Sequence, residues 1–215
     1  MFITTALSFP FPTVSFPTGS RHLKFWDLSS LNPAASNAQL SGTKASQMLQ
    51  RGDSNMVEAC FCTRTEGGSY SLSHDGFLCM FDHQRALTKW VDVKVNTFFH
   101  RTFTLCFLPF DAAAQVSGAS SISCSSSLIA CGCNEGIVRL FETETLLYKA
   151  TLPRPLSEDL AYIESCSNKH PDVKSVSMSR DGSNLCVLYA DRYRIPLHIF
   201  KCSRFHFIFQ EHRGF

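Results

Sequence analysis

Apolar residues in this chain recur in short runs separated by turn residues, a pattern typical of β-strands. The clearest example spans residues 128–142, where two apolar runs flank a turn that ends at Gly136. Side chains of a strand alternate between its two faces. Ile129, Cys131 and Cys133 are therefore expected to share one face of the first strand. Ile137, Arg139 and Phe141 are expected to share one face of the return strand, with Val138 and Leu140 opposite them. Because both faces hold apolar residues and an isolated hairpin is marginal in water, this hairpin requires a covering sheet on each side.

A turn followed by a strand that ends in an aromatic residue occurs three times. In each copy the aromatic lies five residues after the turn residue, and an acidic residue follows it. The three pairs are Trp26 with Asp27, Phe81 with Asp82, and Phe141 with Glu142. Asp75-Gly76, which opens the second copy, is the strongest short-range hairpin signal. Gly136 opens the third copy, where glycine supplies the positive φ that favours a tight turn.

These copies predict the four-stranded blades of a β-propeller, because a Trp-Asp dipeptide is a signature of WD-repeat blades. The closing pairs lie 55 and 60 residues apart, longer than the typical blade of about 40–45 residues, which leaves room for long Ser-rich loops. A fourth copy begins at Asp191-Arg192 but has Leu197 at the aromatic position. We therefore predict an all-β chain that forms an incomplete propeller of about three to four blades.

On this interpretation the chain divides into four segments. Residues 1–95 hold about two blades, with a Ser- and Asn-rich loop at 29–56. Residues 120–200 hold about two more blades, the last incomplete, and 201–215 match no earlier copy. Residues 96–119 are interpreted as an insertion or loop, because a long connection without structure is unusual inside a compact domain.

Further elements are expected outside the three copies. The additional strands are 57–63, 87–91, 146–152, 172–178, 184–189 and 195–200. Residues 156–168 are expected to form a short helix, because Ser157 is a good N-cap and acidic residues follow it. Pro153-Arg-Pro155 ends an outer strand, since proline cannot donate to a sheet, and is interpreted as a connector between blades rather than a polyproline docking motif.

Charge and cysteine content narrow the functional classes. The net charge is +2 and the basic residues are scattered, so there is no electrostatic case for binding nucleic acid. Ten cysteines suggest disulfides or zinc, but Cys60 with Cys62 and Cys131 with Cys133 are alternate strand positions, not the C-x-x-C pairs of zinc sites. The sequence shows neither a basic signal-peptide region nor an apolar run long enough to span a membrane. We expect reduced, mostly buried thiols in a cytoplasmic protein.

No residue pattern indicates a catalytic, metal or cofactor site. The eight histidines are spread singly, and His74 falls in a turn. Neither a Gly-rich phosphate loop nor a nucleophile elbow occurs. Arg51-Gly-Asp53 is interpreted as a chance match to an adhesion tripeptide. The residues singled out are structural blade turns and closing pairs: Trp26, Asp27, Asp75, Gly76, Phe81, Asp82, Gly136 and Phe141.

Six runs of the sequence, taken in order, match one known family. They are residues 19–26, 78–82, 87–91, 131–141, 151–155 and 170–172. These runs resemble the mitogen-activated protein kinase-binding protein family of WD-repeat scaffolds, which includes the microcephaly-associated spindle-pole protein. The Leu-Pro-Arg-Pro run after a Cys-Gly-Cys strand is fairly specific. The resemblance covers about 18–95 and 120–192, whereas 96–117 and 193–215 depart from the family pattern, as a partial or truncated member would.

The resemblance implies a scaffold in JNK stress-kinase signalling and at the centrosome or mitotic spindle pole, with other proteins as partners. The family's kinase-docking segments lie beyond its propellers and have no counterpart in this sequence, so kinase binding is not carried over. Two alternatives stay open. One is a cysteine-dependent enzyme on a β-rich fold, because a histidine partner would be close only in space. The other is a truncated product without independent function.

Overall fold

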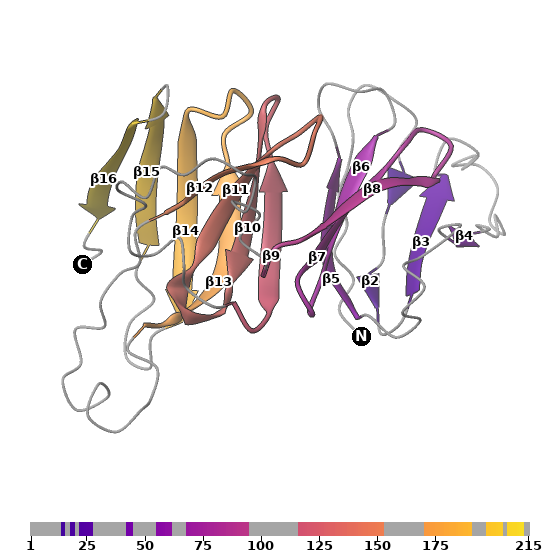
Figure 1. Ribbon diagram of the computed structural model, residues 1–215, viewed down its shortest axis with the longest axis horizontal. Helices are drawn as coiled ribbons and strands as arrows, with labels where there is room; N and C mark the ends of the chain where they lie inside the picture. Colours follow the sequence, from indigo (N-terminus) through magenta and orange to yellow (C-terminus); the bar gives the residue numbers. More distant parts are fainter. Residues whose placement is uncertain are drawn as a thin grey trace, which may run out of the picture.

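The computed structural model describes ten parts of the chain: 14–15, 18–19, 22–27, 42–44, 55–61, 68–94, 116–152, 170–190, 197–203 and 206–212. Side chains are described within 23–25, 55–61, 68–94, 116–152 and 170–190, and at 199. Apart from one 3-10 turn, η2 (Asn134–Gly136), the regular elements in these parts are β-strands. They form four antiparallel sheets of four strands each, which stand side by side (Figure 1). The predicted all-β class is confirmed.

The four sheets follow one another along the chain. Sheet 1 contains β1 (Val14–Ser15), β2 (Thr18–Gly19), β3 (His22–Asp27) and β4 (Gly42–Lys44). Sheet 2 contains β5 (Met56–Phe61), β6 (Ser69–Ser73), β7 (Phe77–Phe81) and β8 (Leu87–Asp92). Sheet 3 contains β9 (Ala119–Cys124), β10 (Leu128–Cys133), β11 (Val138–Glu142) and β12 (Tyr148–Thr151). Sheet 4 contains β13 (Asp172–Met178), β14 (Asn184–Ala190), β15 (Leu197–Ser203) and β16 (His206–His212). In sheets 2 to 4 the strands pair in chain order, as in propeller blades.

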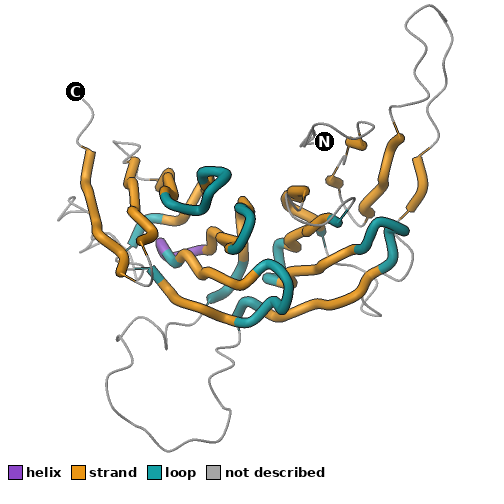
Figure 2. The backbone as a smooth tube through the Cα atoms, turned by 90° about the horizontal axis from the view of Figure 1, so that it is seen from above, coloured by secondary structure: helices purple, strands orange, loops and turns teal. Residues whose placement is uncertain are grey.

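The sheets follow an arc, with the described strands of sheets 1 and 4 at its two ends (Figure 2). The first strand of sheet 3, β9, contacts both β5 and β13, the first strands of the neighbouring sheets. Three apolar clusters fill the spaces between successive sheets. The core is therefore divided among the interfaces between sheets, because a single sheet cannot cover its own faces.

The hairpin of β10 and β11 is covered on both sides, as its alternation predicts. Ile129, Cys131, Cys133, Ile137 and Phe141 pack in one cluster with residues of sheet 2. Ala130, Val138 and Leu140 pack in another with residues of sheet 4. In the register of the hairpin, Ile129 lies opposite Phe141 and Ala130 opposite Leu140. The shared faces predicted within each strand are confirmed, and the structure adds that the two sets lie on the same side of the sheet.

The turns between the second and third strands of sheets 2 and 3 have positive φ angles. Gly76 has φ +84° and Gly136 has φ +70°, and Glu135 also lies in the left-handed region with φ +56°. Non-glycine residues are uncommon there. The second and third copies also share a shift of strand register. It falls immediately before Phe81 in the pairing of β7 with β8, and immediately before Phe141 in the pairing of β11 with β12.

Strands also occur where the sequence pattern gives none. β9 lies in a Ser-rich stretch, β4 lies inside the expected loop 29–56, and β16 lies in the unassigned tail, paired with β15 along seven positions. The division into four segments stays a prediction. The tripeptide 51–53, nearly all of the insertion, the connector 153–155, the helix 156–168 and the turn at 191–192 fall outside the described residues.

Candidate interaction site

The aromatic members of the closing pairs are buried between sheets. Phe81 and Phe141 are each 1% exposed. The Phe81 ring meets Phe25 of β3 edge-on, with ring centroids 5.7 Å apart, and Phe141 meets Tyr148 at 6.1 Å. Such edge-to-face pairs stabilise beyond the apolar area that they bury. Trp26 lies in β3 at the end of sheet 1's central strand, and its side chain, like that of Asp27, lies outside the described residues.

The acidic members shape the turn that leads to the outermost strand. The Asp82 N–H donates to the Ala86 carbonyl at 3.0 Å, and the Asp82 carboxylate accepts from the Ala86 N–H at 2.9 Å. In sheet 3 the Glu142 N–H donates to the Leu147 carbonyl at 2.9 Å. Asp75 is exposed in the turn before β7. The structure therefore places these residues within separate blades and does not bring them together into one site.

Strand β9 joins three sheets through its serine side chains. The Ser121 hydroxyl donates to the Glu58 carboxylate of sheet 2 at 2.6 Å and accepts from the Val176 N–H of sheet 4 at 3.1 Å. The Ile122 N–H donates to the same Glu58 oxygen at 2.8 Å. The Ser123 hydroxyl accepts from the Met178 N–H at 2.9 Å. Sequence reasoning missed this strand because serine has no strong preference for strands, and its hydrogen-bond partners are distant in sequence.

Cys60, Cys79, Cys131 and Cys133 lie within the packed sheets and have raised pKa values. A hydrogen bond with Cys124, followed by burial and nearby charges, raises the pKa of Cys60. Burial, together with the neighbouring Cys133, raises the pKa of Cys131. Burial raises the pKa of Cys79 to about 12, and that of Cys133 to about 12 although the Arg139 charge acts against it. A reactive thiol requires a lowered pKa, so these four thiols are protonated at neutral pH.

Arg139 lies buried at the interface of sheets 2 and 3. Its Nη1 donates to the Val93 carbonyl, which follows β8. Burial lowers the pKa of the guanidinium, whereas Cys133, Tyr148 and Asp92 oppose that change. A buried guanidinium needs such a hydrogen-bond acceptor. This arginine therefore holds the third strand of one blade against the edge of its neighbour.

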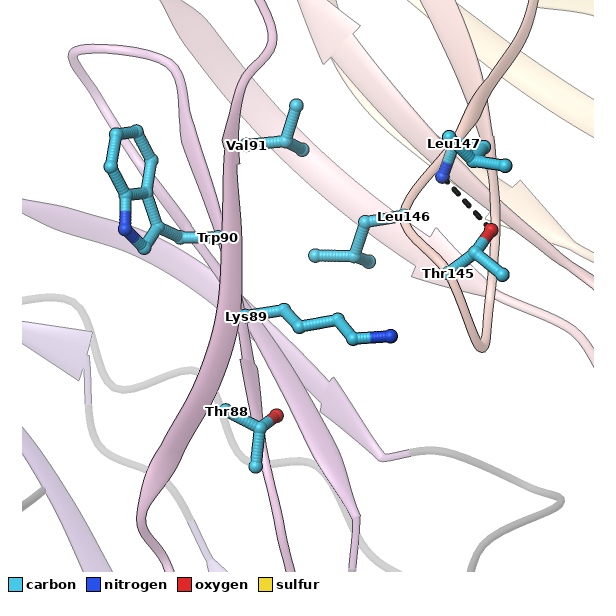
Figure 3. Close-up of a pocket in the computed structure, with 7 residues that line it drawn as sticks. All are labelled: Thr88, Lys89, Trp90, Val91, Thr145, Leu146 and Leu147. Atoms are coloured by element: carbon cyan, nitrogen blue, oxygen red, sulfur yellow. Dashed lines mark hydrogen bonds between the residues drawn. The ribbon is translucent and has the colours of Figure 1, made fainter.

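A shallow groove opens between the outer parts of sheets 2 and 3. Its volume is about 380 Å³, and it is lined by Thr88, Lys89, Trp90, Val91, Thr145, Leu146 and Leu147. Figure 3 shows Lys89, Val91 and Leu146 facing the space between β8 and the turn before β12, with Trp90 on the opposite side of β8. No sequence pattern predicts this groove, because its two walls are more than fifty residues apart and meet only when the sheets pack.

Two groups hold the walls of the groove. The Lys89 ammonium of β8 reaches across to the sheet 3 turn and donates to the Glu144 carbonyl at 3.1 Å. Within that turn, the Leu147 N–H donates to the Thr145 hydroxyl at 3.1 Å, and that hydroxyl donates to the Glu142 carboxylate at 2.5 Å. This hydrogen bond and the Lys149 ammonium, 2.9 Å from Glu142, lower the pKa of that carboxyl.

Other kinds of site are not seen in the described parts of the chain. No group of three or more His, Cys, Asp or Glu side chains lies close enough there to hold a metal ion. Within the same ranges, no helix has the length and apolar character needed to cross a bilayer.

Comparisons with known proteins find relatives with two names, WD repeat-containing protein 62 and mitogen-activated protein kinase-binding protein 1. WD repeat-containing protein 62 of Mus musculus is 32% identical over 162 residues, which cover 73% of this chain and 9% of the relative. Mitogen-activated protein kinase-binding protein 1 of Homo sapiens is 30% identical over 200 residues, 87% of this chain and 12% of the relative. WD repeat-containing protein 62 of Sus scrofa is 29% identical over 203 residues. The chain thus spans 9–12% of the length of these relatives. No family model matches the chain.

The arrangement of sheets also matches a solved structure. A chain in the crystal structure of a mitotic checkpoint complex superposes with a TM-score of 0.58 at 11% identity, covering 93% of this chain and 47% of the other. At that identity the match shows the fold. The repeated four-stranded sheets and the sequence relatives together show that the chain is a WD-repeat protein with an incomplete propeller, related to WD repeat-containing protein 62 and mitogen-activated protein kinase-binding protein 1, the family expected from its sequence.

Proposed function

We propose that the chain is a non-catalytic interaction scaffold whose partners are other proteins. The observation that carries this proposal is the groove between sheets 2 and 3, where apolar side chains and a lysine are open to solvent. Large apolar side chains exposed on a rigid sheet framework are typical of surfaces that bind other proteins. The relatives, which are WD-repeat proteins, support the same role.

The thiol chemistry of the described residues favours a scaffold over a cysteine-dependent enzyme. A nucleophilic cysteine works as its thiolate and needs a depressed pKa. The pKa values of Cys60, Cys79, Cys131 and Cys133 are raised instead. Cys124 uses its thiol to donate to the Phe61 carbonyl at 2.7 Å. The contact of Cys124 with Phe61 joins sheets 2 and 3.

The finer proposal is a cytoplasmic role in JNK stress-kinase signalling and at the centrosome or spindle pole. Its support is the sequence relationship: one relative is named for binding a mitogen-activated protein kinase. Direct kinase binding is not part of the proposal, because the matching segment is 12% of that relative and the resemblance places kinase docking outside the propellers.

Localisation in dividing cells tests the proposal. The full chain, fused to a fluorescent protein, is expected to concentrate at spindle poles together with a centrosome marker, whereas the fluorescent protein alone stays diffuse. Co-precipitation should recover JNK-pathway proteins, while purified JNK should not bind the purified chain directly. A diffuse signal from a chain that resists limited proteolysis would overturn the cellular role. A chain degraded rapidly under the same conditions would instead support the truncated product.

A further inference from the structure

Two large apolar side chains stand exposed on neighbouring blades. Within the described residues, Trp90 is 54% exposed and Leu147 is 60% exposed. They belong to different sheets, yet both line the same groove. Most side chains of this size in the described sheets are buried. Both residues border the groove, but the Trp90 ring lies on the opposite side of β8 from it (Figure 3), so the exposed surface extends over both faces of this strand.

The strand that carries Trp90 lies at the edge of its sheet. β8 pairs with β7 and is the last strand in the order of sheet 2, and no described strand pairs with its outer side. Thr88, Lys89 and Trp90 are consecutive exposed residues of β8. An exposed edge offers backbone N–H and C=O groups to another strand. An extended peptide can pair with such an edge and gain main-chain hydrogen bonds.

The two faces of β8 offer different chemistry. Lys89 and Val91 face the groove and Leu146, whereas Trp90 lies on the other side of the strand (Figure 3). The Trp90 ring is held edge-on against Phe77, with centroids 5.7 Å apart. A peptide strand paired with β8 alternates its side chains in the same way. One of its residues therefore meets Trp90, and the residue next to it meets Lys89.

The charge of the groove selects one side-chain type. Among the residues that line it, Lys89 carries the charged side chain. Its ammonium donates to the neutral Glu144 carbonyl, which leaves the positive charge in place, and a lysine has three N–H donors. A carboxylate is the complementary group. The groove is also open and shallow, which suits a peptide chain better than a small molecule, since small-molecule sites enclose most of their ligand.

We propose that the β8 edge and the adjoining groove bind an extended peptide segment of a partner protein, in which an apolar residue that packs on Trp90 is adjacent to an acidic residue that faces Lys89. This inference rests on the proposed scaffold function and names the partner's chemical class. The peptide gains main-chain hydrogen bonds from the edge of β8 and its selectivity from the two side chains.

Three capped, fluorescently labelled octapeptides test the proposal by anisotropy titration of the full chain. The first alternates leucine with aspartate, the second has lysine in place of aspartate, and the third repeats the first with an N-methylated backbone. The variants are Trp90→Ser and Lys89→Glu, and Lys174→Glu on β13 is the matched control, because Lys174 is also exposed but lies on sheet 4. Circular dichroism confirms that each variant is folded, as expected for exposed positions.

The aspartate peptide is expected to bind the unaltered chain about two- to fivefold more tightly than the lysine peptide, the range for an exposed charge pair. Lys89→Glu should reverse that order, Trp90→Ser should weaken binding by about tenfold, and Lys174→Glu should change neither. The N-methylated peptide should lose binding. Binding that survives N-methylation, or that neither groove variant alters, overturns the proposal, as does the absence of binding by the aspartate peptide.

Self-association is a separate outcome. If sedimentation velocity shows a dimer of the chain that Trp90→Ser dissociates, the edge pairs with a second copy and the peptide proposal is overturned. The Trp90→Ser chain also separates this inference from the scaffold role. Its continued concentration at spindle poles, together with lost peptide binding, would support both proposals. Peptide binding by a chain that stays diffuse in cells would overturn the cellular role alone.

Discussion

At the scale of single residues, the cysteines show how a chemical motif and a packing position differ. Cys131 and Cys133 share a face of β10 that packs against sheet 2, and both are fully buried. Cys79 is buried in β7, between sheets 1 and 2. Alternate spacing in a strand sends both members of a Cys-x-Cys pair into one apolar layer. Their residue type suggests reactivity, whereas their periodicity predicts burial, and the structure agrees with the periodicity.

Buried thiols make stability depend on alkaline pH. Burial raises the pKa of Cys79 from its ordinary value of 9.0 to about 12. Below pH 9 both states hold the proton, whereas above pH 9 the unfolded chain loses it first. The free energy of unfolding should therefore fall between about pH 9 and 12, by up to about 1.4 kcal/mol per pH unit for each such thiol.

Urea unfolding at pH 8, 9, 10 and 11 under reducing conditions measures this fall. Cys79→Val, which keeps a similar volume and removes one titrating group, should make the fall less steep. The comparison at pH 8 is the control, because it gives the cost of the substitution itself. Equal pH dependence in both proteins would show that the Cys79 thiol ionises equally easily in both states.

At the scale of elements, β9 is a strand that the sequence pattern did not predict, and it contacts strands of three sheets. Its residues look like a Ser-rich loop, yet Ser121 bridges Glu58 of β5 and the Val176 N–H of β13. A buried hydrogen-bonded group that loses its partner keeps its desolvation cost. Backbone hydrogen bonds pair the strands within each sheet, whereas the side chains of β9 make the hydrogen bonds that link neighbouring sheets.

Ser121→Ala should destabilise the chain by about 1–3 kcal/mol, because it removes one donor from Glu58 and leaves the Val176 N–H without its acceptor. Urea unfolding at neutral pH gives the difference. Ser177→Ala, on an exposed position of β13, is the matched control and should change stability by less than about 0.5 kcal/mol. A loss no larger than that of the control would mean that water replaces the hydroxyl at this junction.

The sequence was informative where local pattern determines the element. Alternation over 128–142 predicted both faces of the hairpin, and Gly76 and Gly136 marked turns with positive φ. β9 was not predicted because its serines hydrogen-bond to residues of other sheets, and the local sequence pattern does not reveal such distant partners. β16 was not predicted because residues 201–215 match none of the earlier repeat copies. The groove was missed because exposure of Trp90 and Leu147 is a property of packed sheets.

At the scale of the whole molecule, the arc depends on how closely the sheets approach. Gly132 of β10 faces sheet 4, and a Cβ added there would lie 2.6 Å from Val173 Cγ1 and 3.1 Å from Val176 Cγ1. Real Cβ atoms do not approach so closely, so the absence of a side chain sets the spacing of sheets 3 and 4. The remaining apolar contacts of this interface depend on that spacing.

Gly132→Ala should therefore destabilise the chain by about 1–3 kcal/mol through overpacking. Val173→Ala alone should also destabilise, because it removes buried methyl groups. The double variant should lose less than the sum of the two, since the smaller side chain makes room for the new methyl group. Thermal or urea unfolding of the four proteins completes the cycle. Strict additivity would show that sheet 4 moves away freely and that the spacing is not fixed at Gly132.

The bridge at Ser121 also has a consequence for the order of folding events. Ser121 is 63 residues from Glu58 and 55 from Val176, whereas strands within sheets 2 and 3 are joined by much shorter connections. Closing long loops costs more entropy, so local hairpins should form first and sheets should dock late. Stopped-flow measurements should then show Ser121→Ala accelerating unfolding while leaving the refolding rate nearly unchanged. A slowed refolding rate would instead place the junction of the three inner strands in the folding nucleus.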